Sequence, residues 1–189
     1  MKKTLVIVFA LAASLSSFAQ KWTLDNSHAK LSFTITHLLI SDAEGSFKKF
    51  SSTITSSKDD FSDAVIELSA DVNSVDTDND QRDEHLKKPD YLDAAKYPTL
   101  TFKSKSFKKV ADKKYKLAGD LTLHGVTKPI ELDVTYNGTA VHPYTKKTLA
   151  GFKITGSLKR TDYGIGTGTP EAVLSDEVKI VANTEFIKE

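Results

Sequence analysis

From residue 22 to the C-terminus, apolar and polar residues alternate with a period of two in segments that turn residues separate. This alternation is typical of β-strands that bury one face and expose the other. The segments that fit the pattern are 22–25, 31–37, 50–54, 66–72, 100–104, 115–123, 126–136, 152–158 and 178–186. We therefore expect an all-β protein with eight or so half-buried strands, of which the first is short.

The connections between these segments favour antiparallel neighbours. His124-Gly125 is a two-residue turn with glycine where a positive φ is wanted, and Asp112-Lys113 lies in another tight connection. Asn137-Gly138 is expected to open a longer loop that runs through Pro143, and Phe47 falls out of phase, which indicates a bulge. Eight antiparallel strands with one polar face close naturally into a barrel, because closure removes exposed edges. The predicted fold is an eight-stranded antiparallel β-barrel.

The stretch 79–95 is the exception to the alternation and predicts a short helical insertion. Asp78, Asn79 or Asp80 can cap a helix over 81–88, and Pro89 ends it. Only the connection that contains this helix is long enough to join two parallel strands. We expect the helix to cover one end of the barrel.

The inward face of the predicted barrel carries both large apolar residues and small ones. Ser104, Gly119, Gly156 and Ala182 fall in the apolar phase of four separate strands. Either they leave an open lumen that suits a long, thin, apolar ligand, or they face large residues across a filled core. If the lumen is open, its candidate lining residues are Phe33, Ile35, Phe50, Ile66, Leu68, Phe102, Gly119, Leu121, Leu132, Ile154 and Gly156.

The N-terminal residues 1–19 have the pattern of a cleavable signal peptide. Lys2 and Lys3 precede an apolar run that is too short to span a bilayer, and small residues precede a cleavage site between Ala19 and Gln20. The mature domain is then 20–189, and its location is periplasmic or secreted. No later segment is apolar enough to cross a membrane.

Composition narrows the classes of function. The chain has no cysteine, which excludes disulfides, thiolate metal sites and a cysteine nucleophile. Removal of Lys2 and Lys3 changes the formal net charge from +1 to −1, because 24 basic side chains remain against 25 acidic ones. Nucleic-acid binding is therefore not expected, since it requires a basic surface.

Few residues have the spacing of a catalytic or metal site. The five histidines form no recognised metal-binding motif, no serine lies in a nucleophile elbow, and no pair of carboxylates stands out. His124 and His142 are interpreted as surface or structural residues. The loop 163–175 is interpreted as a flexible connection. We expect no cofactor, no metal and no catalytic residue.

Arg82 and His85 are three residues apart and share one face of the predicted helix. Either they bind a polar head group where the helix covers the lumen, or Arg82 and Asp83 fix the helix to the barrel by ion pairs while Leu86 and Tyr91 plug the end. His28 and His37 flank one strand and would meet a head group or cap the strand. The candidates for binding a head group or anchoring the helix are His28, Arg82, His85 and Arg160.

Several ordered blocks of the sequence resemble the YceI-like family of exported bacterial proteins. The blocks are Trp22-x-x-Asp25-x-x-His28, Phe33 and His37, Gly45-x-Phe47, Arg82-Asp83-x-His85-Leu86, Tyr97-Pro98 with Phe102, Gly119-x-Leu121, His124-Gly125-Val126-Thr127, Arg160-x-Asp162-Tyr163-Gly164 and Asp176-x-Val178. Tyr91 departs from the family, which often has Phe there. The resemblance implies a lipocalin-like barrel with an apolar channel that holds a polyisoprenoid or a similar amphiphile.

The leading hypothesis is that the protein carries or sequesters an isoprenoid-type lipid. Barrels of this size can pair, so a homodimer is one expected assembly. One alternative is an enzyme that acts on an isoprenoid-type substrate with Arg82, His85 and Asp162. The other is a structural exported barrel with a filled core.

Overall fold

The computed structural model describes residues 19–189. The predicted signal peptide therefore lies outside the described residues, except for Ala19. The strands are β1 (Gln20–Leu24), β2 (Lys30–His37), β3 (Ser41–Phe47), β4 (Phe50–Ser56), β5 (Val65–Asp71), β6 (Val75–Asp76), β7 (Thr99–Ala111), β8 (Lys114–Leu123), β9 (Val126–Val141), β10 (Thr148–Lys159) and β11 (Leu174–Lys188). Within residues 19–189, one α-helix, α1 (Asp80–Leu86), and three 3-10 turns, η1 (Asn26–His28), η2 (Val72–Ser74) and η3 (Arg160–Tyr163), complete the fold.

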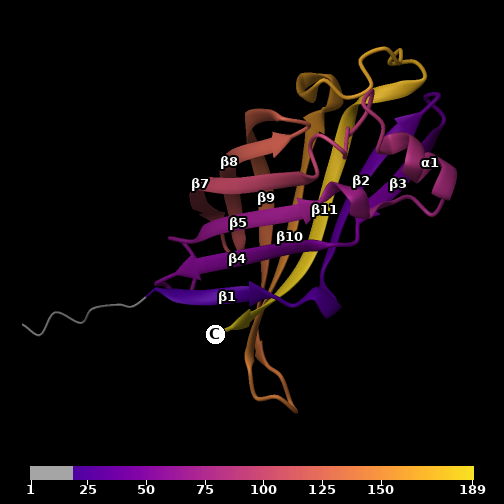
Figure 1. Cartoon of the computed structure of the whole chain (residues 1–189). Coiled ribbons are helices and arrows are strands. Elements are labelled where there is room, and N and C mark those ends of the chain that lie inside the picture. Colours follow the sequence, from indigo (N-terminus) through magenta and orange to yellow (C-terminus); the bar gives the residue numbers. More distant parts are fainter. Residues whose placement is uncertain (1–18) are drawn as a thin grey trace, which may run out of the picture.

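The strands form one sheet that closes on itself as an antiparallel barrel (Figure 1). The ring runs β1-β4-β5-β7-β8-β9-β10-β11, and β1 pairs with β11 to close it. The strands β2, β3 and β6 continue the lines of β1, β4 and β5 after short breaks, and β2 pairs with another part of β11. The predicted eight-stranded antiparallel barrel is confirmed.

The alternating pattern sets which face of each strand is buried. In β8, Tyr115, Leu117, Gly119, Leu121 and Leu123 are buried, and the residues between them are partly exposed. A shift by one residue would turn the whole apolar set toward solvent, so the register is strongly specified.

The two tight connections that the sequence predicts are present. His124 and Gly125 both have positive φ, at 51° and 74°, in the turn between β8 and β9. Asp112 and Lys113 connect β7 to β8, and Lys113 also has a positive φ. Positive φ at the centre of a two-residue hairpin matches the twist of the flanking strands.

Two predictions about irregular segments are wrong. Asn137 and Gly138 do not open a loop, because β9 continues to Val141 and the register shifts by one residue opposite Gly151 and Phe152. This Asn-Gly pair therefore lies at a bulge, where Gly138 has a φ of 121°. At Phe47 the register between β2 and β3 is continuous, and the change of phase marks the end of β3 instead of a bulge.

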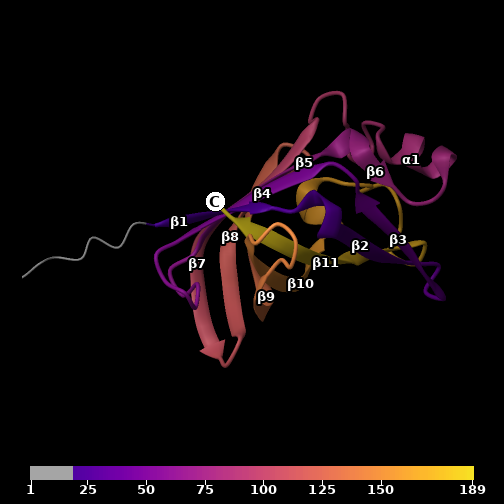
Figure 2. The same cartoon turned by 90° about the horizontal axis from the view of Figure 1, so that it is seen from below.

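Helix α1 lies in the long connection between β6 and β7, near one end of the barrel (Figures 1 and 2). The Asn79 side chain accepts a hydrogen bond from the Arg82 amide at 3.0 Å and so begins the helix. The helix ends at Leu86, two residues before the predicted end. Strand β6 continues the line of β5, and β5 pairs antiparallel with β7, so this long connection joins antiparallel neighbours.

The opposite end of the barrel is closed by an aromatic cluster. Phe61, from the loop between β4 and β5, is 1% exposed and packs against Trp22, Tyr136 and Phe152 with ring centroids 5.1–5.3 Å apart. The Tyr115 hydroxyl donates to the Asp60 carbonyl of the same loop at 2.5 Å. This end is therefore a packed core.

Candidate ligand-binding cavity

The barrel encloses an apolar cavity of about 720 Å³ between the aromatic cluster and α1. Eight of the predicted lumen residues line it: Phe33, Ile35, Ile66, Leu68, Phe102, Leu121, Leu132 and Ile154. Further lining residues that were not singled out from the sequence include Leu31, Leu100, Phe107, Leu117, Val178 and Ile180. Except for Phe107, which follows a register shift after Ser104, they lie on predicted strands in the same alternating phase, so the pattern itself could have identified them.

Gly119 and Gly156 do not line the cavity, which corrects the prediction that they leave it open. A Cβ at Gly119 would lie 2.5 Å from the Phe102 ring and 2.4 Å from the Lys103 carbonyl oxygen. A Cβ at Gly156 would lie 2.4 Å from Leu132 Cδ2. Each glycine is thus covered by a large side chain of a neighbouring strand.

Phe50 is also absent from the lining. It is half-buried and packs against the core at the start of β4, directly after the break at Lys48 and Lys49. Ser104, another small residue, accepts a hydrogen bond on its Oγ from the Ile66 amide at 2.8 Å. Of the four small inward residues, only Ala182 lines the cavity.

The lining becomes polar and exposed at one end, which marks the mouth of the cavity. The exposed polar lining residues are His37, Ser41, Asp42, Glu44, Asp78 and Arg82. They belong to the β2–β3 hairpin and to the start of α1. The cavity therefore opens between this hairpin and the helix.

Arg82 and Asp83 attach α1 to the barrel through Thr77. Arg82 donates from Nε to Thr77 Oγ1 at 2.8 Å and from Nη2 to the Thr77 carbonyl at 2.6 Å. The Asp83 carboxylate accepts from the Thr77 amide and hydroxyl at 2.9 and 2.6 Å. These contacts are hydrogen bonds to Thr77, whereas the sequence-based interpretation expected ion pairs.

His85 lies outside the cavity lining. It is exposed, and its ring meets the Tyr91 ring edge-to-face with centroids 4.8 Å apart. Leu86, Tyr91 and Leu92 do line the cavity and cover it from the helical segment. Among the three residues of the enzyme alternative, Arg82 alone lines the cavity. Asp162 is exposed and accepts a hydrogen bond from Lys128 Nζ at 2.8 Å.

Arg160 is 3% exposed and organises the loop that follows η3. Its five N–H groups donate to the backbone carbonyls of Ile165, Gly166, Thr169, Leu174 and Ser175. A guanidinium has only five N–H donors, so none is left for a ligand. The loop 163–175 is consequently ordered around Arg160, and Ile165 and Leu174 from this segment line the cavity.

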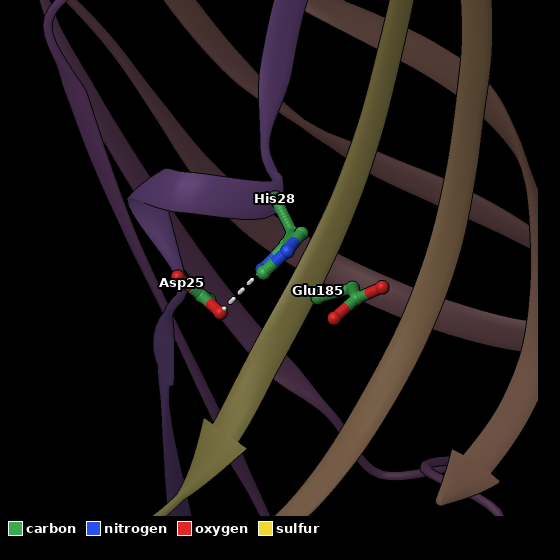
Figure 3. Close-up of side chains that lie close together, drawn as sticks. All are labelled: Asp25, His28 and Glu185. Atoms are coloured by element: carbon green, nitrogen blue, oxygen red, sulfur yellow. Dashed lines mark hydrogen bonds and ion pairs between the residues drawn. The ribbon is translucent and has the colours of Figure 1, made fainter. Parts of the chain in front are cut away.

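His28 lies outside the cavity, in a polar cluster with Asp25 and Glu185 (Figure 3). Its Nδ1 is 2.9 Å from Asp25 Oδ2, and this hydrogen bond raises the pKa of the imidazole, helped by the charges of Asp25 and Glu185. One potential ligand atom from each of these side chains lies within 4.8 Å of the others, so the cluster could hold a metal ion. Asp25 also caps η1 through the Ser27 amide, and this gives the cluster a sufficient structural role.

Among residues 19–189 there is no helix that is long and apolar enough to cross a membrane.

Known proteins resemble this chain in sequence and in structure. The YceI-like domain matches residues 22–186. The protein YceI of Salmonella newport is 36% identical over 195 residues, which covers all of both chains. The crystal structure of a Campylobacter jejuni YceI protein is 35% identical, has a TM-score of 0.74, and aligns with 82% of this chain and 90% of that one. A polyisoprenoid binding domain from Saccharophagus degradans shares the fold, with a TM-score of 0.68 at 18% identity over 89% of this chain and 98% of that one.

Proposed function

The chain belongs to the YceI-like family, and we propose that its barrel binds a polyisoprenoid or a similar long apolar lipid and carries or sequesters it in the periplasm or outside the cell. The observation that carries this proposal is the cavity of about 720 Å³ inside the barrel, whose walls are apolar and whose mouth is polar. This volume lies within the range of about 300–1,000 Å³ that is typical of small-molecule sites. The name of the Saccharophagus degradans domain supports the choice of ligand class.

Apolar burial alone supplies enough free energy for such binding. A chain of ~20 methylene equivalents at ~0.8 kcal/mol each gains roughly 16 kcal/mol. Association and ordering cost on the order of 4–15 kcal/mol. The head group then has only to set the orientation of the lipid.

Arg82 is the best-placed cation for a head group. It lines the mouth, and its bonds to Thr77 occupy two of its five N–H donors. Arg160 has no donor left, and His28 and His85 lie outside the lining. The polar end of the lipid would therefore lie near the start of α1.

Export is proposed from the signal-peptide pattern of residues 1–19. The family and the polyisoprenoid binding domain among its structural neighbours favour binding over catalysis for this barrel.

The proposal is tested by native mass spectrometry of protein produced in an exporting host and purified without detergent. We expect an additional bound mass that organic extraction releases as a long isoprenoid. Protein that emerges without a ligand and takes up no prenyl lipid would contradict the proposal.

A matched pair of variants tests the position of the ligand. Ala182→Phe places a large side chain inside the cavity, whereas Ala118→Phe makes the same change on a partly exposed position of β8 that does not line it. We expect Ala182→Phe to lose the bound lipid and Ala118→Phe to keep it, with both variants showing the circular dichroism of the parent. Equal lipid binding by the two variants would place the ligand elsewhere.

A further inference from the structure

The tip of the β2–β3 hairpin exposes three consecutive aliphatic side chains. Leu38, Leu39 and Ile40 are 47%, 69% and 84% exposed. Val173, 39% exposed, lies beside them, because its carbonyl accepts the Leu38 amide at 2.9 Å. Leu38, Leu39, Ile40 and Val173 together are called the apolar tip below.

The backbone of the tip is unfavourable for leucine. Leu38 and Leu39 have φ of 51° and 61°, and the Ile40 amide bonds the His37 carbonyl at 3.2 Å, as in a two-residue turn. Asn-Gly is the preferred pair at such positions, and positive φ is unusual for a bulky residue. Neither folding nor solubility calls for leucine here, so these side chains need another explanation.

The apolar tip borders the mouth of the cavity. His37 and Ser41, which flank the three tip residues in the sequence, both line the cavity. Figure 1 shows the hairpin at the same end of the barrel as α1, with the loop that follows η3 beside it. Whatever binds the tip therefore also faces the entrance of the apolar cavity.

We infer that the apolar tip inserts into the surface of a lipid bilayer and so places the cavity mouth against the membrane. A protein partner is a poorer fit, since a stable interface uses about 20–30 residues on each side and the tip offers a small convex group without aromatic or arginine anchors. The charged residues around the tip are mainly acidic, and Arg82 beside the mouth is the cation among them. The acidic residues are Asp42 and Glu44 on the hairpin, Asp78 beside the mouth, and Glu171 and Asp176 on either side of Val173 in the sequence. Attraction to anionic lipid is therefore not the driving force, and the bilayer is recognised through apolar insertion.

This inference rests on the proposed function, because it supplies the route by which a lipid enters the cavity. The test is flotation of the purified protein with phosphatidylcholine vesicles. The informative variant is Leu38→Asn combined with Leu39→Gly, which removes two apolar side chains and gives the turn its preferred residues, so folding is retained. The matched control removes apolar groups from the opposite hairpin, Val141→Ser with Tyr144→Ser, at positions 62% and 89% exposed.

We expect the parent and the control to float with the vesicles and the tip variant to bind about tenfold more weakly or worse. Binding should persist between about 0.1 and 1 M salt, over which the screening length falls from ~10 to ~3 Å. Equal flotation of the tip variant and the parent would overturn the inference. So would a parent that stays unbound, needs anionic lipid, or forms a dimer that the tip variant abolishes.

A second measurement separates this inference from the proposed function. A prenyl lipid is offered either dissolved in ethanol or within vesicles, and uptake is followed by native mass spectrometry. The tip variant should take up the dissolved lipid like the parent but acquire the vesicle lipid about tenfold more slowly. Tip-dependent flotation without uptake of any lipid would contradict the proposed function and leave the membrane-binding tip in place, whereas equal uptake from vesicles would overturn the role of the tip in loading.

Discussion

At the scale of single residues, Arg160 shows how one buried cation can order a long loop. The segment between η3 and β11 has no regular structure, yet three of its carbonyls and two at the start of β11 converge on this side chain. Buried carbonyls require donors, and a planar guanidinium can satisfy several from one position. The loop is thus a fixed part of the cavity wall.

We expect Arg160→Lys to lower the free energy of unfolding by about 2–4 kcal/mol, since a lysine cannot reach all five carbonyls and leaves buried acceptors unpaired. Urea denaturation measures this loss, and hydrogen exchange should show faster exchange within 163–175. The matched control is Arg82→Lys, where the exposed guanidinium bonds only Thr77 and the cost should stay below about 1 kcal/mol. Similar losses for the two variants would show that the network around Arg160 is not special.

His28 and Asp25 predict a pH-dependent contribution to stability. The hydrogen bond to Asp25 raises the pKa of His28 above 6.5, and the same bond lowers the pKa of Asp25 below 3.8. A raised histidine pKa stabilises the folded state fully below pH 6.5, and this contribution is lost as the pH rises through the folded-state value. The lowered aspartate pKa acts above pH 3.8 and is lost as the pH falls through its own folded value.

Titration of His28 by NMR, with a chelator present, tests this pair. We expect Asp25→Asn to bring the pKa of His28 down toward its ordinary value, because asparagine keeps the cap of η1 but carries no charge. Glu185→Gln should have a smaller effect, since Glu185 contributes less than Asp25. A His28 pKa that does not change in Asp25→Asn would show that the ion pair does not form in solution.

At the scale of elements, three neighbouring strands are interrupted at the same level of the barrel. The breaks are η1, Lys48-Lys49 and η2. The second and third bond each other: the Lys48 amide donates to the Ser74 carbonyl at 3.0 Å, and the Asp71 amide to the Lys49 carbonyl at 2.9 Å. The parts of these strands on the far side of the breaks from the closed ring are β2, β3 and β6. They form the side of the barrel that carries the mouth. The breaks therefore let one sheet both close around a core and extend past it.

The β8–β9 turn is sensitive to a single added methyl group. Gly125 has a φ of 74°, and a Cβ there would lie 2.3 Å from Tyr97 Cε1. We expect Gly125→Ala to lower the free energy of unfolding by about 2 kcal/mol or more, from backbone strain together with the clash.

The measurement for this turn is urea denaturation of Gly125→Ala beside Gly168→Ala. A Cβ at Gly168 meets nothing within 4 Å, and its φ is outside the left-handed region, so this control should be close to neutral. Near-parental stability of Gly125→Ala would mean that the Tyr97 ring moves away without cost.

At the scale of the whole molecule, the barrel divides its interior between a packed end and an empty one. The loop that carries Phe61 fills the end near β1 and the C-terminus, whereas α1 and the Arg160 loop cover the other end without filling it. An eight-stranded barrel is near the size at which side chains either fill the interior or leave room for one ligand. Here the aromatic residues decide which part is filled. A homodimer stays a prediction.

The sequence by itself determined the strand pattern, the antiparallel closure, the tight turns and the position of the helix. These features depend on local period and turn chemistry, which neighbours along the chain specify. The same pattern placed eight of eleven candidate residues on the cavity wall, because the alternating phase assigns side chains to the inner face.

The tertiary structure alone decided where space remains and which polar residues are free. Gly119 and Gly156 looked like gaps, but Phe102 and Leu132 of neighbouring strands occupy the space above them. Arg160 was a candidate for a head group, but carbonyls up to fifteen residues away use all its donors. Both outcomes depend on side chains that meet across strands or loops, and a one-dimensional pattern carries no information about such meetings.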